Sequence, residues 1–481
     1  MTPAIATVDW SVFRIEAILA AALGAAFVTD LVRPSGSRSP AGWFLLAGSV
    51  GALVASFGWP VPDTALWDGA FVVDGLARFF KILFLASVAL VVLASLKDMR
   101  DRPWAGEYYL CLGASGLGMM ILAGAGDLVT LFVALELTSL SLYVMAAIRR
   151  GDVRSQEAGL KYLLIGAFST ALFLFGASFL FAVGGSTGLR ELSLAGPLHA
   201  ADPLMAFGLV LILAAVGFKT ASVPFHMWAP DVYEGGPTPM VAFTSVASKA
   251  AGFLIAIRLL LGPFHVLQED WTILLSVMCA ATIVVGSFLA IPQTNIRRLL
   301  AYSSIAQAGY LLIGFIPGTP RGVSAVLFYL AVYLVTNLAA FLTVIIVSRS
   351  TGTDEIADYA GLARRSPLLA LAMMLALLSL AGIPPLGGFI GKFQLFASAM
   401  EFPEKFLWLV VLGVVLSIVS LYYYLLVIRR MYIEEPASDA PITPGAAATI
   451  ALVICVLGIL AFGIAPRYLL DVAMGVAARI V

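Results

Sequence analysis

Residues 204–231 read LMAFGLVLILAAVGFKTASVPFHMWAPD, and this stretch indicates the kind of fold that the chain adopts. It begins as an unbroken apolar run of the kind that spans lipid, but it continues into Lys219, Pro224 and His226. A lysine is costly in hydrocarbon, and a proline removes a backbone donor where water cannot replace it. We therefore expect a membrane-spanning helix that is broken here, with a functional lysine beside the break.

The composition of the whole chain agrees with a membrane protein. Of its 481 residues, 61% are hydrophobic and 12% are charged, and the mean hydropathy is +1.01. Soluble domains carry about 25% charged residues, so a soluble chain this apolar would lack a surface to present to water. The formal net charge is zero, which gives no electrostatic reason to expect nucleic acid as a partner. The expected surroundings are the lipid bilayer and other membrane subunits.

The sequence offers no motif for a metal or a cofactor. Cys111, Cys279 and Cys455 are far apart, and no CxxC pair or Cys/His cluster occurs. The chain also lacks a Walker loop, a GxGxxG that follows a strand, and a GxSxG elbow. We expect no metal site and no cofactor site in this chain, so that any redox or nucleotide chemistry would belong to another subunit.

Hydropathy predicts an all-α polytopic membrane protein with about fourteen transmembrane helices. The first contains Arg14 and Glu16 and is too long for a signal-peptide core, so we expect it to be retained. The predicted spans begin near Val12, Ala41, Ala77, Gly106, Leu128, Gly159, Pro203, Thr238, Thr272, Arg297, Gly322, Pro367, Phe406 and Thr443.

The distribution of cationic residues predicts the orientation. Fifteen lysines and arginines fall in the loops after odd-numbered spans, and five fall in the other loops and the C-terminal tail. Because cytoplasmic loops carry the excess of positive charge, we expect the odd loops in the cytoplasm. Both termini would then lie on the periplasmic, outer side of a bacterial inner membrane.

Two predicted spans are interrupted by proline. The seventh is broken at Pro224, and the twelfth is broken at Pro384 and Pro385 within AGIPPLGGFIGKF. Broken helices at corresponding positions of two halves indicate inverted repeats. The breaks are five spans apart, which predicts two inverted five-helix repeats, spans 4–8 and 9–13. The predicted divisions are three N-terminal helices in 1–105, the first repeat in 106–262, the second repeat in 263–432 and a C-terminal helix in 433–481.

Four ionisable residues lie well inside apolar runs: Glu136, Lys219, Lys249 and Lys392. Each costs roughly 2.5–3.5 kcal/mol on insertion scales. Structural ion pairs are one explanation, and Glu136 with Lys219 could form such a pair. Lys249 and Lys392 would then have no carboxylate partner. Because burial favours the neutral form of a lysine, we expect these residues to transfer protons.

Other polar residues give weaker indications. His226 could extend a proton path or act as a hydrogen-bonded anchor. Glu157 and Lys161 are four residues apart at the start of the sixth span, on one face of the predicted helix. They could form a surface ion pair or contact a neighbouring subunit. Arg258 lies near a span end, where we expect its side chain to snorkel.

Four stretches resemble the antiporter-like membrane subunits of the bacterial proton-pumping NADH:quinone oxidoreductase, respiratory complex I, and most closely its subunit N family. They are LFVALELTSLSLYVMAA, GFKTASVPFHMWAPDVYEGGPTPMVAFTSVASKAAGF, QTNIRRLLAYSSIAQAGYL and LAGIPPLGGFIGKF. By this resemblance, the family's proton-transfer residues fall on Glu136, Lys219, Lys249 and Lys392, and its sixth-span acid and lysine fall on Glu157 and Lys161. The resemblance also implies sister subunits as partners, with NADH, FMN, iron–sulfur clusters and quinone in the rest of the complex.

One departure from the family concerns Gln307, where some relatives have a titratable histidine. Two alternatives to a proton-translocating subunit of complex I remain open from the residues. One is a subunit of a multi-subunit cation/proton antiporter, and the other is a subunit of a related membrane-bound hydrogenase or ferredoxin-oxidising complex.

Overall fold

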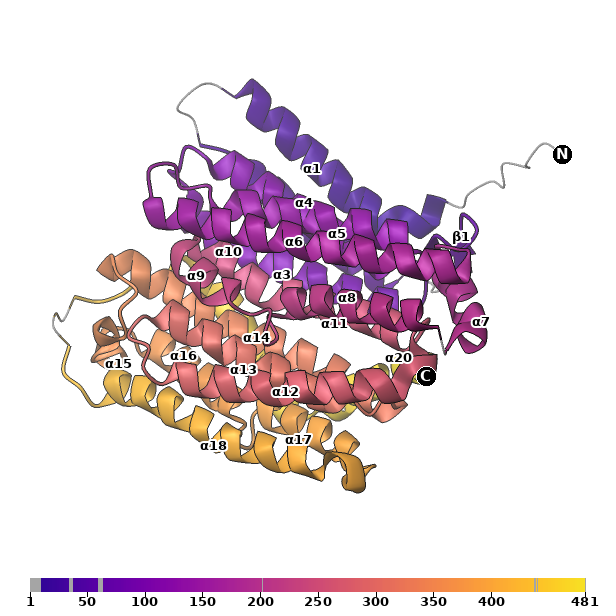
Figure 1. Cartoon of the computed structure of the whole chain (residues 1–481). Coiled ribbons are helices and arrows are strands. Elements are labelled where there is room, and N and C mark those ends of the chain that lie inside the picture. The colour runs from indigo at the N-terminus through magenta and orange to yellow at the C-terminus, as the bar shows by residue number, and fades with distance from the viewer. Residues whose placement is uncertain are drawn as a thin grey trace.

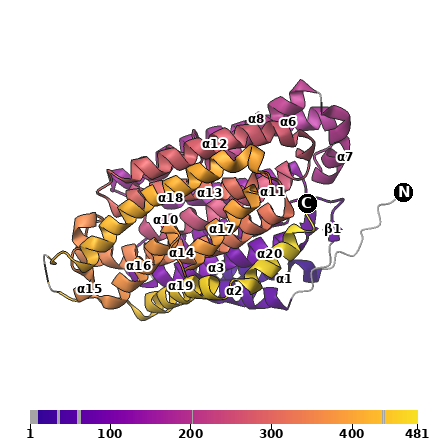
Figure 2. The same cartoon turned by 90° about the horizontal axis from the view of Figure 1, so that it is seen from below.

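The computed structural model describes residues 10–33, 38–58, 64–200, 202–436, 438 and 440–480. Nearly all of this part of the chain is helical, and the helices run roughly side by side in one bundle (Figure 1). Helices α1 (Arg14–Val32) and α18 (Pro403–Tyr432) lie at opposite edges of this view. Figure 2, seen from below, places the last helices on the same side as two of the first: α19 (Ala446–Ile464) and α20 (Arg467–Ala477) lie with α2 (Ala41–Phe57) and α3 (Gly75–Met99).

The N-terminal part contains three long helices and a small hairpin. A 3₁₀ turn at Trp10–Phe13 leads into α1, and the two strands of the hairpin pair in antiparallel fashion. The other elements are α2 (Ala41–Phe57), β1 (Thr64–Leu66), β2 (Phe71–Val73) and α3 (Gly75–Met99).

Two further groups of helices lie between α3 and α19. The first comprises α4 (Ala105–Ala123), α5 (Leu128–Ala146), α6 (Val153–Gly184), α7 (Leu189–His199), α8 (Pro203–Thr220), α9 (Trp228–Gly235), α10 (Thr238–Phe243), the π-helical turn η2 (Thr244–Ser248) and α11 (Lys249–Leu260). The second comprises η3 (His265–Leu267), α12 (Gln268–Ala290), α13 (Ile296–Phe315), α14 (Pro320–Thr351), η4 (Ile356–Tyr359), α15 (Leu362–Arg365), α16 (Pro367–Ala381), α17 (Gly387–Ala399) and α18.

The beginnings of many of these helices follow from local chemistry. A short polar side chain accepts a hydrogen bond from a backbone N–H of the first turn, which satisfies a donor that the helix itself cannot pair. Proline opens α8, α14, α16 and α18, where its missing N–H costs nothing. The capping residues are Asp74, Asp127, Asp152, Asp202, Asn295 and Thr319.

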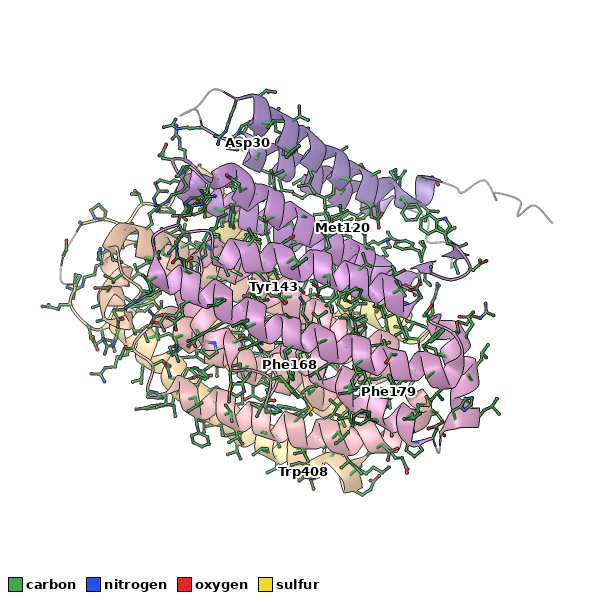
Figure 3. All side chains as sticks on the ribbon, turned by 45° about the horizontal axis from the view of Figure 1, so that its top comes forward. Asp30, Met120, Tyr143, Phe168, Phe179 and Trp408 are labelled. Carbon is green, nitrogen blue, oxygen red and sulfur yellow. The ribbon has the colours of Figure 1, made fainter. Side chains whose placement is uncertain are left out.

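The predicted all-α polytopic class is confirmed. Ten helical segments in the described part of the chain are long and apolar enough to cross a membrane. The outer surface of the bundle is also apolar: Phe168 on α6 is 63% exposed and Trp408 on α18 is 50% exposed (Figure 3). An apolar exterior of this extent is stable in lipid, where no water has to be excluded from it.

The predicted break at Pro224 separates α8 from α9. Ala221 ends α8 in the left-handed conformation, with φ of 57°. The N–H of Ser222 then bonds to the carbonyl of Gly217 at 2.8 Å, and the N–H of Ala221 bonds to that of Phe218 at 3.1 Å. This is the Schellman pattern that closes a helix end.

The predicted break at Pro384 and Pro385 separates α16 from α17 and has the same hydrogen bonds. Gly382 is left-handed, with φ of 89°. The N–H of Ile383 bonds to the carbonyl of Leu378 at 3.0 Å, and the N–H of Gly382 bonds to that of Ser379, also at 3.0 Å. The two helix ends therefore have the same geometry, and in each break a proline, Pro224 or Pro385, lies three residues after the left-handed residue.

The second break also depends on a close approach at Gly388. A β-carbon at this position would lie 1.8 Å from the carbonyl oxygen of Ser379, and the backbone N–H of Gly388 donates to the Ser379 hydroxyl at 3.1 Å. Only glycine fits there, because the opposing atom is backbone and cannot rotate away.

We predict that Gly388→Ala destabilises the protein by about 1–3 kcal/mol, because the backbone of α16 and α17 has to move apart. The measurement is the thermal denaturation midpoint and yield of the purified membrane assembly. Gly24→Ala is the matched control, since a β-carbon at Gly24 meets nothing within 4 Å. Equal stability of the two variants would contradict this account of the break.

Candidate functional site

Lys219 lies in the last turn of α8, directly before the first break. Its side chain is buried, with 3% of the residue exposed, and its Nζ donates a hydrogen bond to Oγ of Ser139 on α5 at 2.9 Å. The helix break therefore places an ammonium group inside the bundle rather than against lipid. Its partner in the structure is a neutral hydroxyl.

Glu136 lies on α5, one turn before Ser139, and it is only half-buried. Its Oε1 accepts a hydrogen bond from Oγ1 of Thr170 on α6 at 2.6 Å. The suggested direct ion pair between Glu136 and Lys219 is not formed, because each side chain reaches a hydroxyl on a neighbouring helix instead. Ser139, Thr170 and Lys219 together line a cavity of about 10 Å³, which is close to the space that one water molecule needs.

Lys249 begins α11 immediately after the π-helical turn η2. It is 2% exposed, and its Nζ donates to two backbone carbonyl oxygens, that of Thr220 at 3.1 Å and that of Ser304 on α13 at 2.6 Å. Thr220 is the residue after Lys219, and its carbonyl is one that the broken helix leaves without an intrahelical donor. Lys249 thus supplies a hydrogen-bond donor to a carbonyl that the break beside Lys219 leaves free.

Gln307 lies one turn beyond Ser304 on α13 and is fully buried. Its Nε2 donates to the carbonyl of Leu380 at 3.0 Å, and its Oε1 accepts from the hydroxyl of Tyr329 at 2.5 Å. Leu380 belongs to the end of α16, at the second break. A side chain that cannot titrate therefore links α13 to this break through its amide N–H and to α14 through its amide oxygen.

Lys392 lies on α17, just after the second break, and is 4% exposed. Its Nζ donates to the carbonyl of Ala381 at 3.3 Å and to Oγ of Ser417 on α18 at 3.0 Å. The same ammonium lies 4.2 Å from the ring centroid of Tyr310 on α13. At this distance the electron-rich face of the ring stabilises the cation.

One face of α13 connects the two breaks. Ser304, Gln307 and Tyr310 recur every three residues and contact Lys249, the end of α16 and Lys392 in turn. Of these three residues, only Gln307 was singled out from the sequence. Their three-residue spacing within SSIAQAGY, which places polar atoms along one side of a helix, was the available signal.

Other buried or partly buried cations have carboxylate partners. Lys81 on α3, which the sequence reasoning missed, is fully buried and lies 2.6 Å from Oε1 of Glu16 on α1. Arg258, which was expected to snorkel, is partly buried, and its guanidinium makes two contacts to the carboxylate of Asp74, at 2.5 and 2.9 Å. The reason is that the end of α11 packs against the start of α3, where Asp74 also caps the helix.

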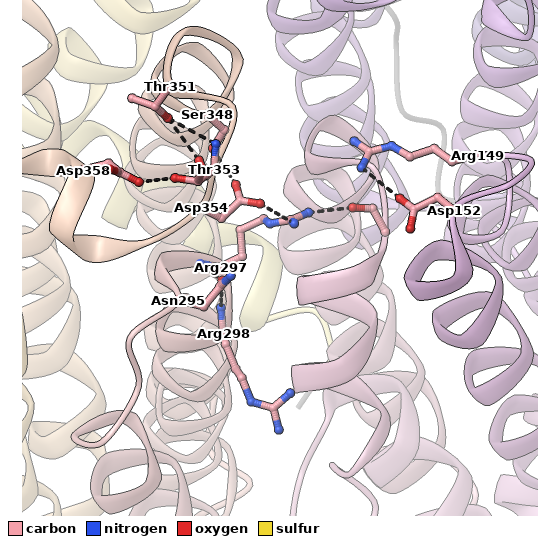
Figure 4. Close-up of polar contacts among 11 residues, drawn as sticks. Arg149, Asp152, Asn295, Arg297, Arg298, Ser348, Thr351, Thr353, Asp354 and Asp358 are labelled. Atoms are coloured by element: carbon pink, nitrogen blue, oxygen red, sulfur yellow. Dashed lines mark hydrogen bonds and ion pairs between the residues drawn. The ribbon is translucent and has the colours of Figure 1, made fainter.

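Charged side chains also tie the helices together at one end of the bundle (Figure 4). Arg297, at the start of α13, donates to the carbonyl of Gly236 at 2.8 Å and to Oδ2 of Asp354 at 2.5 Å. The other oxygen of Asp354 accepts from Ser348 at 2.5 Å. These contacts fix the beginning of the helix that carries the central polar face.

The predicted pair of Glu157 and Lys161 on α6 is present at 2.7 Å. Lys161 also contacts Asp231 on α9 at 2.7 Å, and Arg298 on α13 contacts the other oxygen of Asp231 at 2.9 Å. Asp231 was not singled out from the sequence, although it links three helices. The pair is therefore part of a network between helices and lies apart from the buried lysines.

His226 lies in the connection between α8 and α9 and is half-buried. Its Nδ1 is buried, and in the described part of the chain no protein atom forms a hydrogen bond with it. The structure does not place it against Lys219 or Lys249. Its two predicted roles, extending a path or anchoring the chain, both remain predictions.

Comparison with known proteins gives consistent matches. A family model described as NADH:quinone oxidoreductase/Mrp antiporter, TM, matches residues 125–420. The NADH-quinone oxidoreductase subunit N of Desulforamulus reducens is 45% identical over 452 residues, which cover 93% of this chain and 94% of the relative. The protein of the same name from Moorella thermoacetica is 44% identical over 463 residues, which cover 96% and 97%.

Solved structures agree with these matches. A chain of respiratory complex I from Thermus thermophilus with bound aureothin is 35% identical, with a TM-score of 0.81 over 96% of this chain and 99% of that chain. A chain of the Mrp complex from Dietzia sp. is 22% identical, with a TM-score of 0.86 over 98% of both chains. At that identity the second likeness concerns the fold alone.

We predict that Lys81→Met destabilises the protein by about 3–5 kcal/mol, because it leaves Glu16 as a buried carboxylate without its cation. The double variant Lys81→Met/Glu16→Leu should recover most of that loss, since it removes both charges. Thermal denaturation and assembly yield of the purified complex measure the difference. A double variant that is as unstable as the single one would show that the pair is not a simple structural ion pair.

Proposed function

The chain belongs to the subunit N family of NADH-quinone oxidoreductase, an antiporter-like membrane subunit of complex I, and we propose that it moves protons along Glu136, Lys219, Lys249 and Lys392. Redox chemistry in other subunits drives this movement, and NADH, FMN, iron–sulfur clusters and quinone belong to those subunits. The sister membrane subunits of the complex are its partners, and the bilayer surrounds it.

The observation that carries the proposal is the kind of partner that each lysine has. Lys219, Lys249 and Lys392 are at most 4% exposed, and the ion pairs within the described residues include none of them. Their hydrogen bonds go to hydroxyl and backbone carbonyl oxygens. A carbonyl oxygen stabilises an ammonium less than a carboxylate does, and burial disfavours its charge. Such a lysine can lose its proton at a small cost, as a carrier must.

Glu136 is the one carboxylate among the four proposed proton carriers. Its position allows it to control the protonation of Lys219. A cavity of about 10 Å³ is lined by Lys219 and by Ser139 and Thr170, the hydroxyl partners of Lys219 and Glu136. When Glu136 approaches Lys219, its negative charge favours the protonated lysine, and when it withdraws the proton is released. The released proton can then pass toward Lys249, which bonds to the residue next to Lys219.

The helix order supports two five-helix repeats, in 106–262 and 263–432. Their third helices, α6 and α14, both have 32 residues and end in a left-handed glycine, Gly185 and Gly352. Each repeat has an isolated bridge from the cap of its second helix to the chain after its third, Asp127 to Gly188 and Asn295 to Glu355. The fourth helices, α8/α9 and α16/α17, contain the matching breaks.

The two bridges fit an inverted relation between the repeats. Asp127 follows α4 and Asn295 follows α12, so each precedes the second helix of its repeat. If the first helices of the two repeats run in opposite directions, these corresponding points fall at opposite ends of the bundle. With the three N-terminal helices and α19 added, the repeats account for fourteen spans, of which the seventh and the twelfth are broken.

We assign the end that carries the odd-numbered loops to the cytoplasm. Arg102, Arg149, Arg297 and Arg349 come from four such loops and line one cavity of about 620 Å³. The ring of Phe13, just before α1, stacks on Trp67 of the hairpin at 5.1 Å. The C-terminal α20 packs against α3, which follows the hairpin. The start of α1 and the C-terminal helix α20 therefore lie near the same hairpin, which agrees with both termini on the outer side of a bacterial inner membrane.

We predict that Lys249→Arg lowers proton pumping by at least about 10-fold in an assembled complex, because arginine keeps its proton at physiological pH. The measurement is the proton-to-electron ratio in proteoliposomes, with blue-native electrophoresis to check assembly. Lys405→Arg is the control, since Lys405 is an exposed lysine at the start of α18. Wild-type pumping by Lys249→Arg would count against proton release by Lys249.

We predict that the two ends of the bundle are labelled from opposite sides of the membrane. In a background without Cys111, Cys279 and Cys455, an impermeant maleimide added to spheroplasts should label Tyr468→Cys on α20 and spare Arg150→Cys. Inside-out vesicles should reverse the result. Both original side chains are exposed, so accessibility to the reagent depends on the side of the membrane. Labelling of Arg150→Cys from outside would overturn the orientation.

A further inference from the structure

A groove of about 520 Å³ lies where α2, α3, α4 and α19 come together at one end of the bundle. It is formed by the beginnings of α2, α4 and α19 and by the end of α3, so it lies at the level where these helices leave the membrane. It is remote from the buried lysines, none of which lines it.

The polar end of the groove is cationic. Arg38, Lys97 and Arg100 line it and all three are exposed. Arg38 has a carboxylate partner, Asp101, at 3.0 Å, with both side chains more than half exposed. Lys97 and Arg100 have no ion-pair partner among the residues that the structure describes. The groove therefore presents positive charge that the protein itself does not neutralise.

The cationic region continues past Lys97 into a second cavity of about 190 Å³. The two cavities share Lys97 and Gly445, and the second adds Arg349 from the end of α14 and Asp98. The start of α19 borders both, and its capping position, Gly445, has no side chain to cover the first backbone N–H groups. An anion at this place can approach the backbone closely because alanines follow the glycine.

The other end of the groove is apolar and faces outward. Gly42, Trp43, Leu96 and Tyr109 line it, and Trp43 is 63% exposed. The hydroxyl of Tyr109 is hydrogen-bonded to Ser95 at 3.2 Å, which leaves its ring as the contacting surface. Tryptophan and tyrosine are enriched where hydrocarbon meets the head groups of a bilayer.

We propose that this groove binds an anionic phospholipid. The phosphate lies against Lys97 and Arg100, and the acyl chains lie along Trp43 and the neighbouring apolar side chains. The charge of the groove selects an anionic head group, since basic pockets between transmembrane helices at a membrane surface bind such lipids. A lipid here bridges the start of α19 to α2, α3 and α4, and so joins the C-terminal helix to the N-terminal part. The proposal holds whether or not the proton route is correct.

The test uses the intact membrane complex and photoactivatable phosphatidylglycerol with a diazirine in one acyl chain. Photoactivatable phosphatidylcholine is the zwitterionic comparison. After irradiation, mass spectrometry of the peptides identifies the labelled residues. We expect phosphatidylglycerol to label the peptides around Leu96 and Ala447 well above phosphatidylcholine. Lys97→Gln/Arg100→Gln should reduce this labelling by about 10-fold or more, because each cation near the surface contributes separately to the attraction.

Two further variants test whether labelling depends on the charge and the shape of this groove. One removes a cation elsewhere on the protein, and the other fills the groove. Arg429→Gln removes an exposed cation at the end of α18, away from the groove, and should leave the labelling unchanged. Ala447→Trp fills the groove without changing its charge and should also abolish the labelling. Retained NADH:quinone reductase activity shows that each complex is assembled.

The proposal is overturned if the two lipids label the groove equally, or if Lys97→Gln/Arg100→Gln labels as wild type does. It is also overturned if the groove peptides cross-link to another protein chain in place of lipid, which would assign the surface to a neighbouring subunit.

Discussion

The arrangement of this protein depends on one requirement, which is that every backbone carbonyl at a helix break must find a donor where lipid excludes water. Two breaks within the bundle release such carbonyls. At the first, Thr220 accepts from Lys249, and at the second Leu380 accepts from Gln307 and Ala381 accepts from Lys392. The side chains that stabilise the breaks are thus largely the ones proposed to move protons.

The buried and partly buried cations fall into two groups that differ in what they contact. Lys81, Arg258 and Arg297 each face a carboxylate at 2.5–2.6 Å, and breaking such a pair leaves an uncompensated charge that costs several kcal/mol. Lys219 and Lys249 face only hydroxyl or carbonyl oxygens. Removing a proton from these lysines leaves an amine whose remaining N–H groups can still donate to the same hydroxyl or carbonyl oxygens, so a neutral state is accessible. The first group suits permanent connections between helices, and the second suits a charge that changes.

Helix α13 connects the two breaks. It is buried along almost its whole length, and its polar face meets the first break through Ser304 and the second through Gln307 and Tyr310. Arg297 and Arg298 fix its start to α9 and to the chain after α14. A helix that is fixed at one end by ion pairs, and whose polar face forms hydrogen bonds and ring contacts, can hold the two breaks at a constant separation. Glutamine at position 307 fits this connecting role because its amide donates and accepts at once.

The sequence by itself determined the membrane class, the beginnings of most helices, the two breaks and three of the buried lysines, Lys219, Lys249 and Lys392, but not Lys81. These features are local: hydropathy, an aspartate or asparagine cap, and a proline act within a few residues. The partners were decided by the tertiary structure. Arg258 meets Asp74 across 184 positions of sequence, Lys249 meets Ser304 across 55, and Glu136 bonds to Thr170 rather than to Lys219. In a soluble helix a polar outer face would have indicated which side turns inward. Here lipid-facing and core-facing sides are both apolar, so the rotation of each helix, and with it the direction of each charged side chain, is set only when the helices pack against one another.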